Sequence, residues 1–268
     1  MLLRIAFIAF HERSLISDEK EYDQLAYNIA TNAKYSYDSA PTAYRPVGYP
    51  AFVGLSYYFF GHRISCVKSL QALIDIVTAF LIYLLLAGQP ERTRVFGTAL
   101  WAFFPPAIFY SNLLLSETVF TALFILFCWR LTRVHTDNNW KPVALGALLG
   151  ALTLIKPTIA VFIFALPFLM RRMHITPKML YTIAIAFVLV LSPWLVRNYL
   201  VFGEVALSSN GGINLMIGNN PSSTGAYKYP ADPNAPTHAK SEFEADHDAY
   251  RSAVEFIVNN PIVSIANA

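Results

Sequence analysis

Two adjacent carboxylates, Asp18 and Glu19, stand at the start of the segment SDEKEYDQLAYNIA. This segment is predicted to form a helix that is capped at its N-terminus by Ser17 or Asp18. A carboxylate in such a position can act as a general base or bind a metal ion. Acidic residues in a first helical turn also interact favourably with the helix dipole by about 0.3–1 kcal/mol, and spacing alone favours this structural interpretation.

Three further charged residues interrupt or end apolar stretches: Glu117 in LLLSETVF, Lys156 in TLIKPT and Arg197 in PWLVRNY. A charge within an apolar segment is costly unless it pairs or reaches water. Lys156 precedes Pro157, which breaks a helix and frees backbone groups that can line a cavity. These residues therefore suit a polar site. In the alternative interpretation, Glu117 only forms a hydrogen bond with Ser116, and Lys156 and Arg197 only anchor the chain at the membrane interface.

Asp75, Cys66 and Cys128 are not expected to belong to this site. Asp75 lies in the apolar run QALIDIV and is predicted to form a polar contact between helices. The two cysteines fall at opposite ends of different predicted helices, which places them too far apart for a disulfide. Their spacing to the histidines matches no metal site, so both are interpreted as packing residues.

The composition of the chain indicates which surroundings can hold these residues. Of the 268 residues, 55% are hydrophobic and only 14% are charged, whereas soluble domains carry about 25% charged residues. This charge is too sparse to cover a soluble surface, so the lipid bilayer is the expected environment. The net charge of +3 gives no indication of a nucleic-acid partner, and none is expected.

The apolar runs divide the chain into four regions. Residues 1–10 are predicted to be a truncated first transmembrane helix, because about 20 apolar residues are needed to cross a bilayer. Residues 11–64 form an outer loop, and residues 201–268 form an outer Asn-, Gly- and Pro-rich segment with an amphipathic helix over Glu242–Val258 and an incomplete C-terminal part. Residues 65–200 hold about six predicted spans: Ser65–Ala87, Thr93–Tyr110, Leu113–Trp129, Pro142–Ile155, Pro157–Met170 and Met179–Tyr199.

The distribution of cations predicts the orientation of these spans. Short cytoplasmic turns carry an excess of lysine and arginine. With the first long loop outside, three inside turns hold Arg92, Arg94, Arg130, Arg133, Lys141, Arg171, Arg172 and Lys178, whereas Lys156 is the single cation of the short outside turns. This orientation brings the charged candidates to one non-cytoplasmic face: Asp18, Glu19, Arg45, Glu117, Lys156 and Arg197.

The same residues belong to short motifs that follow one another along the chain. They are Asp18-Glu19-x-x-Tyr22-x-x-Leu25-Ala26, AYRPVGYP with Arg45 and Tyr49, SET around Glu117, IKPT around Lys156, RNYLVFGE from Arg197 and SSNGGINLMIGNNPSSTG with Asn210, Asn214 and Asn219. Together they resemble the motifs of GT-C fold glycosyltransferases, in the bacterial branch of protein O-mannosyltransferases and aminoarabinose transferases (glycosyltransferase family 39). Val47 stands where these enzymes often have a second proline, and Lys156 where they have arginine.

The resemblance implies an all-α polytopic membrane protein. We expect a GT-C-like bundle of transmembrane helices, with a large first outer loop that carries short interfacial helices. The protein would be a multi-pass protein of the bacterial inner membrane, with its active site on the periplasmic or extracellular face. Members of the family are longer and have more spans, so we expect a chain truncated at both ends, and its activity in this form is left open.

The resemblance also implies a reaction: inverting transfer of a sugar from a polyprenyl phosphate to an acceptor hydroxyl on a protein, lipid or glycan. Asp18 would act as the base, or would hold a divalent metal that activates the acceptor, with Glu19 beside it. Lys156 and Arg197 would stabilise the charge that grows on the leaving phosphate. The other residues implied in substrate binding are Tyr22, Arg45, Tyr49, Glu117, Asn210, Asn214 and Asn219.

Two other functions remain as alternatives. A lipid-linked sugar transporter or flippase would also hold charges in the membrane, but it predicts charges through the whole membrane depth and repeated broken helices. In this sequence the charges are predicted to gather at one face, and no repeat is found. An inactive, truncated paralogue would retain the helices and lose the site, whereas Asp18, Glu117 and Arg197 are all present.

Overall fold

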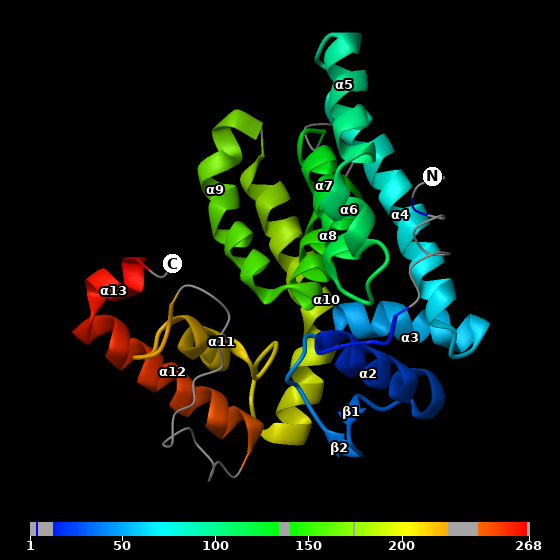
Figure 1. Ribbon diagram of the computed structural model, residues 1–268. Helices are drawn as coiled ribbons and strands as arrows, with labels where there is room; N and C mark the ends of the chain where they lie inside the picture. The colour runs from blue at the N-terminus through cyan, green and yellow to red at the C-terminus, as the bar shows by residue number, and fades with distance from the viewer. Residues whose placement is uncertain (1–3, 5–12, 134–139, 174, 225–240, 267–268) are drawn as a thin grey trace. The chain divides into compact units, whose positions relative to one another are not determined.

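The protein is helical apart from one short hairpin in the parts that the structure describes (Figure 1). This computed structural model describes residues 4, 13–133, 140–173, 175–224 and 241–266. The chain forms two compact units, Met1–Pro41 with Pro46–Trp194 and Thr42–Arg45 with Leu195–Ala268. Except for Arg4, the predicted first transmembrane helix over residues 1–10 lies outside the described residues.

The first unit begins with two helices and a hairpin, shown in blue in Figure 1. Helix α2 spans Asp18–Asn32, strands β1 (Ser36–Tyr37) and β2 (Ala40–Pro41) pair in antiparallel fashion, and helix α3 spans Gly48–Phe60. Helices α2 and α3 pack closely against each other. The buried residues of α2 recur at helical spacing, which gives it one apolar face toward this contact: Tyr22, Leu25 and Ala26.

The remaining helices of the first unit follow in chain order. They are α4 (Ile64–Leu85), α5 (Glu91–Ala102), α6 (Pro105–Tyr110), α7 (Glu117–Leu131), α8 (Trp140–Ile155), the 3₁₀ turn η1 (Pro157–Val161), α9 (Phe162–Met173) and α10 (Pro177–Phe202), whose last residues belong to the second unit. By length and composition, two of the described helices can cross a membrane, α4 and α10. Helix α8 and the segment Pro157–Leu169 are apolar but shorter.

The predicted span Thr93–Tyr110 is wrong as a single helix. Helix α5 ends at Ala102, and α6 starts with Pro105 in its first turn. Proline has no backbone N–H and clashes with the preceding turn, so it ends one helix, but it fits well at the start of the next. The span predicted from Leu113 also starts later, because helix α7 begins at Glu117 after a turn.

Asp75 makes the polar contact between helices that its sequence context predicts. Its carboxylate in α4 forms an ion pair with Arg4 and accepts a hydrogen bond from Trp101 Nε1 at 3.0 Å. Arg4 also donates to the carbonyl of Ala102 at 2.9 Å. Because both charged side chains are buried, the pair ties the start of the chain to α4 and α5 rather than contributing to a site.

Two glycines of α8 allow a close approach to α10. A Cβ atom on Gly146 would lie 2.2 Å from the carbonyl oxygen of Ile183, and one on Gly150 would lie 2.8 Å from Val190 Cβ. The pair has the GxxxG spacing that lets membrane helices approach closely. This contact therefore depends on the absence of side chains at both positions.

We expect Gly146→Ala to lower the free energy of unfolding by about 1–3 kcal/mol, because the new methyl group overpacks the contact. Thermal unfolding of the purified protein in detergent measures this change. The matched control is Gly88→Ala, since a Cβ atom there meets nothing within 4 Å. Equal melting temperatures for the two variants would contradict this account of the contact.

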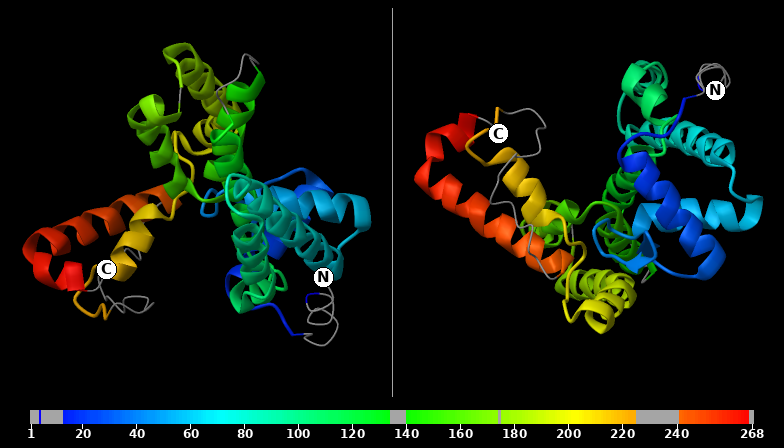
Figure 2. Two further views of the ribbon diagram at one scale, coloured as in Figure 1. Left: turned by 90° about the horizontal axis from the view of Figure 1, so that it is seen from above. Right: turned by 60° about the horizontal axis from the view of Figure 1, so that its bottom comes forward.

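The second unit contains helices α11 (Gly211–Gly218), α12 (Glu242–Asn259) and α13 (Pro261–Ala266). Helices α11 and α12 run side by side in both views of Figure 2. The predicted amphipathic helix from Glu242 is confirmed as α12. Within the Asn- and Gly-rich segment, Gly211–Gly218 form helix α11. Its N-terminal amides at Gly212 and Ile213 donate to the Asp246 carboxylate at 2.7 and 3.0 Å.

Candidate functional site

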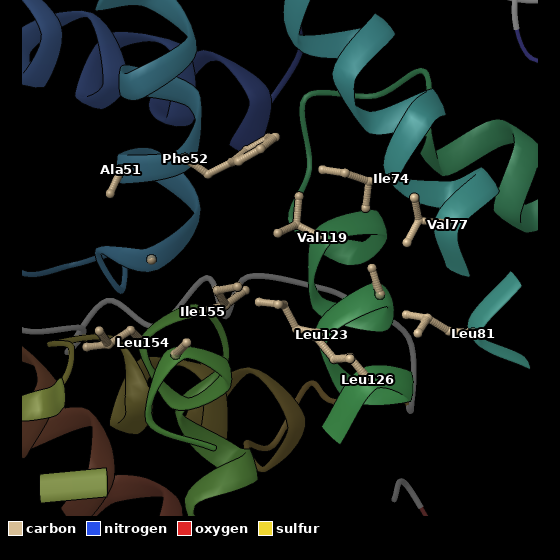
Figure 3. Close-up of a pocket in the computed structure, with 13 residues that line it drawn as sticks. Ala51, Phe52, Ile74, Val77, Leu81, Val119, Leu123, Leu126, Leu154 and Ile155 are labelled. Carbon is tan, nitrogen blue, oxygen red and sulfur yellow. The ribbon is translucent and has the colours of Figure 1, made fainter. Parts of the chain in front are cut away.

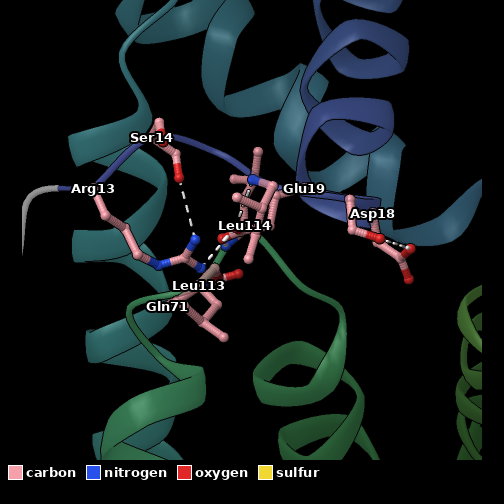
Figure 4. A network of polar contacts seen from close by, with 9 residues as sticks. Arg13, Ser14, Asp18, Glu19, Gln71, Leu113 and Leu114 are labelled. Atoms are coloured by element: carbon pink, nitrogen blue, oxygen red, sulfur yellow. Dashed lines mark hydrogen bonds and ion pairs between the residues drawn. The ribbon is translucent and has the colours of Figure 1, made fainter. Parts of the chain in front are cut away.

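Glu19 is a buried carboxylate whose two oxygens are both bonded within the protein. Its Oε1 accepts the backbone N–H of Leu114 at 2.9 Å. Its Oε2 accepts from the Arg13 guanidinium at 2.7 Å and from the backbone N–H of Ile16 at 3.2 Å. Figure 4 shows these contacts joining the start of α2 to the turn before α7. Glu19 therefore fixes this turn.

Asp18 has different surroundings, although it is the next residue. It is only partly buried, and the Ser17 hydroxyl donates to its Oδ1 at 3.2 Å. In Figure 4 its side chain points away from the cluster around Glu19. Ser17, one of the two predicted caps, occupies the N-cap position of α2, but its side chain makes no capping hydrogen bond. Asp18 is thus the more exposed carboxylate of the pair.

Gln71, on α4, is fully buried and makes three hydrogen bonds. Its Oε1 accepts from the Tyr49 hydroxyl at 2.7 Å. Its Nε2 donates to the carbonyls of Ser111 at 3.1 Å and Leu113 at 2.7 Å. Gln71 and Glu19 therefore hold the same turn from two sides.

Tyr49 lies at the centre of these groups. Its ring meets that of Tyr22 edge-on, with centroids 4.9 Å apart. Burial raises the pKa of the Tyr49 hydroxyl well above its usual value, and the neighbouring tyrosines and the carboxylates of Glu117 and Glu19 raise this pKa further. The hydroxyl consequently stays protonated and remains a hydrogen-bond donor to Gln71.

Glu117 and Lys156 form an ion pair, which was not predicted from the sequence. The Lys156 Nζ lies 3.0 Å from Glu117 Oε1, and both side chains are about one-third exposed, at 37% and 36%. The ammonium group also lies 5.4 Å from the centre of the Phe120 ring. Glu117 Oε2 is buried and has no hydrogen-bond partner among the described residues. The pair places one cation and one carboxylate oxygen in a partly accessible position.

An apolar groove of about 570 Å³ lies between α3, α4, α7 and α8 (Figure 3). Val119 lies two residues after Glu117, and Ile155 directly precedes Lys156, so residues next to the ion pair contribute to its wall. Its lining consists of Gly48, Ala51, Phe52, Ile74, Val77, Leu81, Val119, Ala122, Leu123, Leu126, Ala151, Leu154 and Ile155. The groove suits a long hydrocarbon chain rather than a polar ligand.

Arg197 and Arg45 belong to the second unit. Arg197 Nη1 donates to the carbonyl of Thr42 at 2.8 Å and to the side-chain oxygen of Asn198 at 2.9 Å. The Arg45 guanidinium lies 5.2 Å from the centre of the Tyr44 ring. Glu242 completes this arrangement, because its carboxylate accepts from the Thr42 hydroxyl at 2.8 Å and from the Ala43 amide.

The three predicted asparagines also lie in the second unit, on or beside α11. Asn210 accepts from the Ser208 hydroxyl at 3.0 Å, and Asn219 donates to the carbonyl of Leu215 at 3.0 Å. Asn214 is exposed. Two of the three amides therefore serve the local structure of this helix.

The structure thus groups the predicted residues by unit. The first unit holds Asp18, Glu19, Tyr22, Tyr49, Glu117 and Lys156, and the second holds Arg45, Arg197, Asn210, Asn214 and Asn219. Sequence reasoning missed Gln71 and Glu242. Gln71, a polar residue within an apolar span, could have been found by the criterion that identified Asp75. Nothing local distinguishes Glu242.

Metal binding at Asp18 finds no further support from the side chains around it. Within the described ranges, no group of three or more histidine, cysteine, aspartate or glutamate side chains is arranged to hold a metal ion. The Glu19 carboxylate is already occupied by three donors. The described side chains around Asp18 therefore do not form a metal site, and the reaction proposed below is written without one.

We expect Glu19→Ala to lower the free energy of unfolding by about 1–3 kcal/mol, because the buried N–H of Leu114 loses its acceptor. Thermal unfolding in detergent tests this result. The matched control is Glu255→Ala, which removes an exposed carboxylate from α12. A Glu19→Ala protein as stable as the control would show that the turn does not depend on this carboxylate.

Comparison with known proteins identifies the family. The sequence profile described as dolichyl-phosphate-mannose-protein mannosyltransferase matches residues 44–196, more than half of the chain. The match includes Arg45, Tyr49, Glu117 and Lys156, whereas Asp18 precedes it. No curated protein matches the chain. No solved structure matches it either. The chain therefore belongs to the dolichyl-phosphate-mannose-protein mannosyltransferase family, a family of membrane glycosyltransferases.

Proposed function

We propose that this protein transfers a sugar, with inversion, from a polyprenyl phosphate to an acceptor hydroxyl at the non-cytoplasmic face of the bacterial inner membrane. The main supporting observation is the Glu117–Lys156 ion pair next to an apolar groove of about 570 Å³. A cation beside an apolar groove has the chemistry that an anionic lipid requires, with the phosphate on the ammonium and the prenyl tail along the groove.

Asp18 is the base in the proposed reaction. Its carboxylate takes the proton of the acceptor hydroxyl while the hydroxyl oxygen attacks the anomeric carbon. The bond between that carbon and the phosphate oxygen breaks, and its electron pair leaves with the lipid phosphate. A partly exposed carboxylate suits this role better than a saturated one, which favours Asp18 over Glu19.

Lys156 stabilises the leaving phosphate in this proposal. Negative charge on the phosphate grows as the bond breaks, and a fixed cation lowers the energy of that state. In the free protein Glu117 holds the Lys156 ammonium at 3.0 Å, so the side chain is already oriented before the donor binds. The family resemblance assigns Arg197 to the phosphate as well. It assigns Arg45 to the outer loop that faces the donor or the acceptor.

The sugar and the acceptor are tested together. Membranes containing the protein are incubated with polyprenyl phosphates that carry radiolabelled mannose, glucose, galactose or aminoarabinose, and label in protein, lipid and glycan fractions is counted. We expect transfer from one of these donors, and faster transfer with long prenyl tails than with short ones. The proposed function would be refuted if no donor supported transfer although the protein is inserted in the membrane. The same result must hold for a protein extended at both ends in the reading frame.

A further inference from the structure

The turn between α6 and α7 is unusually well fixed for so short a segment. The backbone N–H groups of residues 111–114 all donate hydrogen bonds, the first three to carbonyls of α6 and the fourth to Glu19. Gln71 binds the carbonyls of Ser111 and Leu113. The Ser111 hydroxyl donates to the carbonyl of Ile108 at 2.8 Å. All of these groups are therefore paired, and one side chain of the turn is an exception.

The exception is the side chain of Asn112. It is only 2% exposed, and neither its Nδ2 nor its Oδ1 has a hydrogen-bond partner among the described residues. A buried amide without partners costs about 1–3 kcal/mol, and native proteins rarely leave such groups unexplained. Gln71 holds the backbone carbonyls on both sides of Asn112.

The contacts of Gln71 and Glu19 hold the backbone on either side of Asn112, and none of them involves its side-chain amide. Such an arrangement costs stability and is maintained where a ligand completes the hydrogen bonds. A carboxamide offers one donor group and one acceptor. This is the combination that a sugar hydroxyl needs, because the hydroxyl also donates and accepts.

We propose that Asn112 binds a hydroxyl group of the donor sugar and that Gln71 and Glu19 position it for this contact. The proposal rests on the proposed function and adds a sugar-recognition residue to the unit that holds Glu117 and Lys156.

The test measures the binding of two lipids to each of two variants. Asn112→Leu replaces the amide with an apolar group of similar size, and Asn32→Leu, at the exposed end of α2, is the control. Binding of the polyprenyl-phosphate sugars named above, and of the same polyprenyl phosphate without sugar, is measured from the ligand-dependent shift in melting temperature. We expect Asn112→Leu to weaken binding of the sugar-bearing lipid by about tenfold, and to leave binding of the sugarless lipid unchanged.

The stability of the ligand-free variant provides the second readout. Removing an unpaired buried amide does not break a bond within the protein, so Asn112→Leu should melt no lower than the wild type. A lower melting temperature, together with an equal loss of binding to both lipids, would show that Asn112 serves packing and would overturn the proposal. The proposal would also be overturned if the variant bound both lipids as well as the wild type does, or if the wild type bound neither lipid. Sugar-dependent binding without any transfer would leave Asn112 as a sugar contact and refute only the proposed reaction.

Discussion

Replacing Asp18 with asparagine is expected to lower kcat for sugar transfer by about 10²–10⁴-fold, the range that general base catalysis contributes. The amide cannot take the acceptor proton, but it has nearly the same size and can still accept from the Ser17 hydroxyl. The KM for the lipid donor should change little, because Asp18 acts on the acceptor. Initial rates over a range of donor concentrations separate the two parameters.

The control for this variant is Asp38→Asn. Asp38 is an exposed carboxylate between β1 and β2 with a positive φ of 45°, a backbone conformation that asparagine adopts readily. Asp38→Asn should therefore retain the wild-type rate and melting temperature. If Asp18→Asn transfers sugar at the rate of this control, in membranes where both proteins insert equally, Asp18 is not the base.

Removing the Lys156 ammonium should have the second largest effect. We expect Lys156→Ala to lower kcat by about 10²–10³-fold, the usual loss when one group that stabilises transition-state charge is removed. Lys156→Arg should retain much more activity, because its guanidinium keeps the charge and can bind two phosphate oxygens. Lys178→Ala, which removes an exposed lysine from the start of α10, is the control.

The ion pair requires one further variant, because Lys156→Ala also leaves Glu117 without its partner. In the double variant Lys156→Ala, Glu117→Gln, the unpaired carboxylate is gone as well. A role on the phosphate predicts that the double variant stays as slow as Lys156→Ala. Recovery of the wild-type rate would instead mean that the loss came from an unpaired Glu117, and that Lys156 only compensates this carboxylate.

The sequence predicted those parts of the fold that depend on local composition. Uniform apolarity over the length of a bilayer predicted α4 and α10, and the amphipathic pattern over Glu242–Val258 predicted α12. The break before Pro105 is also a local feature, because two consecutive prolines interrupt the apolar run that predicts a single span. Helix α11 could not be predicted in this way, because Asp246, from another helix, stabilises its glycine-rich first turn.

The sequence by itself also determined the family and the candidate site residues, since the motifs and the charged residue types can be read directly from it. Only the tertiary structure shows that Glu19 is saturated within the protein, because one of its donors is the amide of Leu114, 95 residues away. It likewise paired Lys156 with Glu117 and left Asn112 unpaired. The availability of a side chain for a ligand depends on which distant groups already bind it, and that information exists only once the chain has folded.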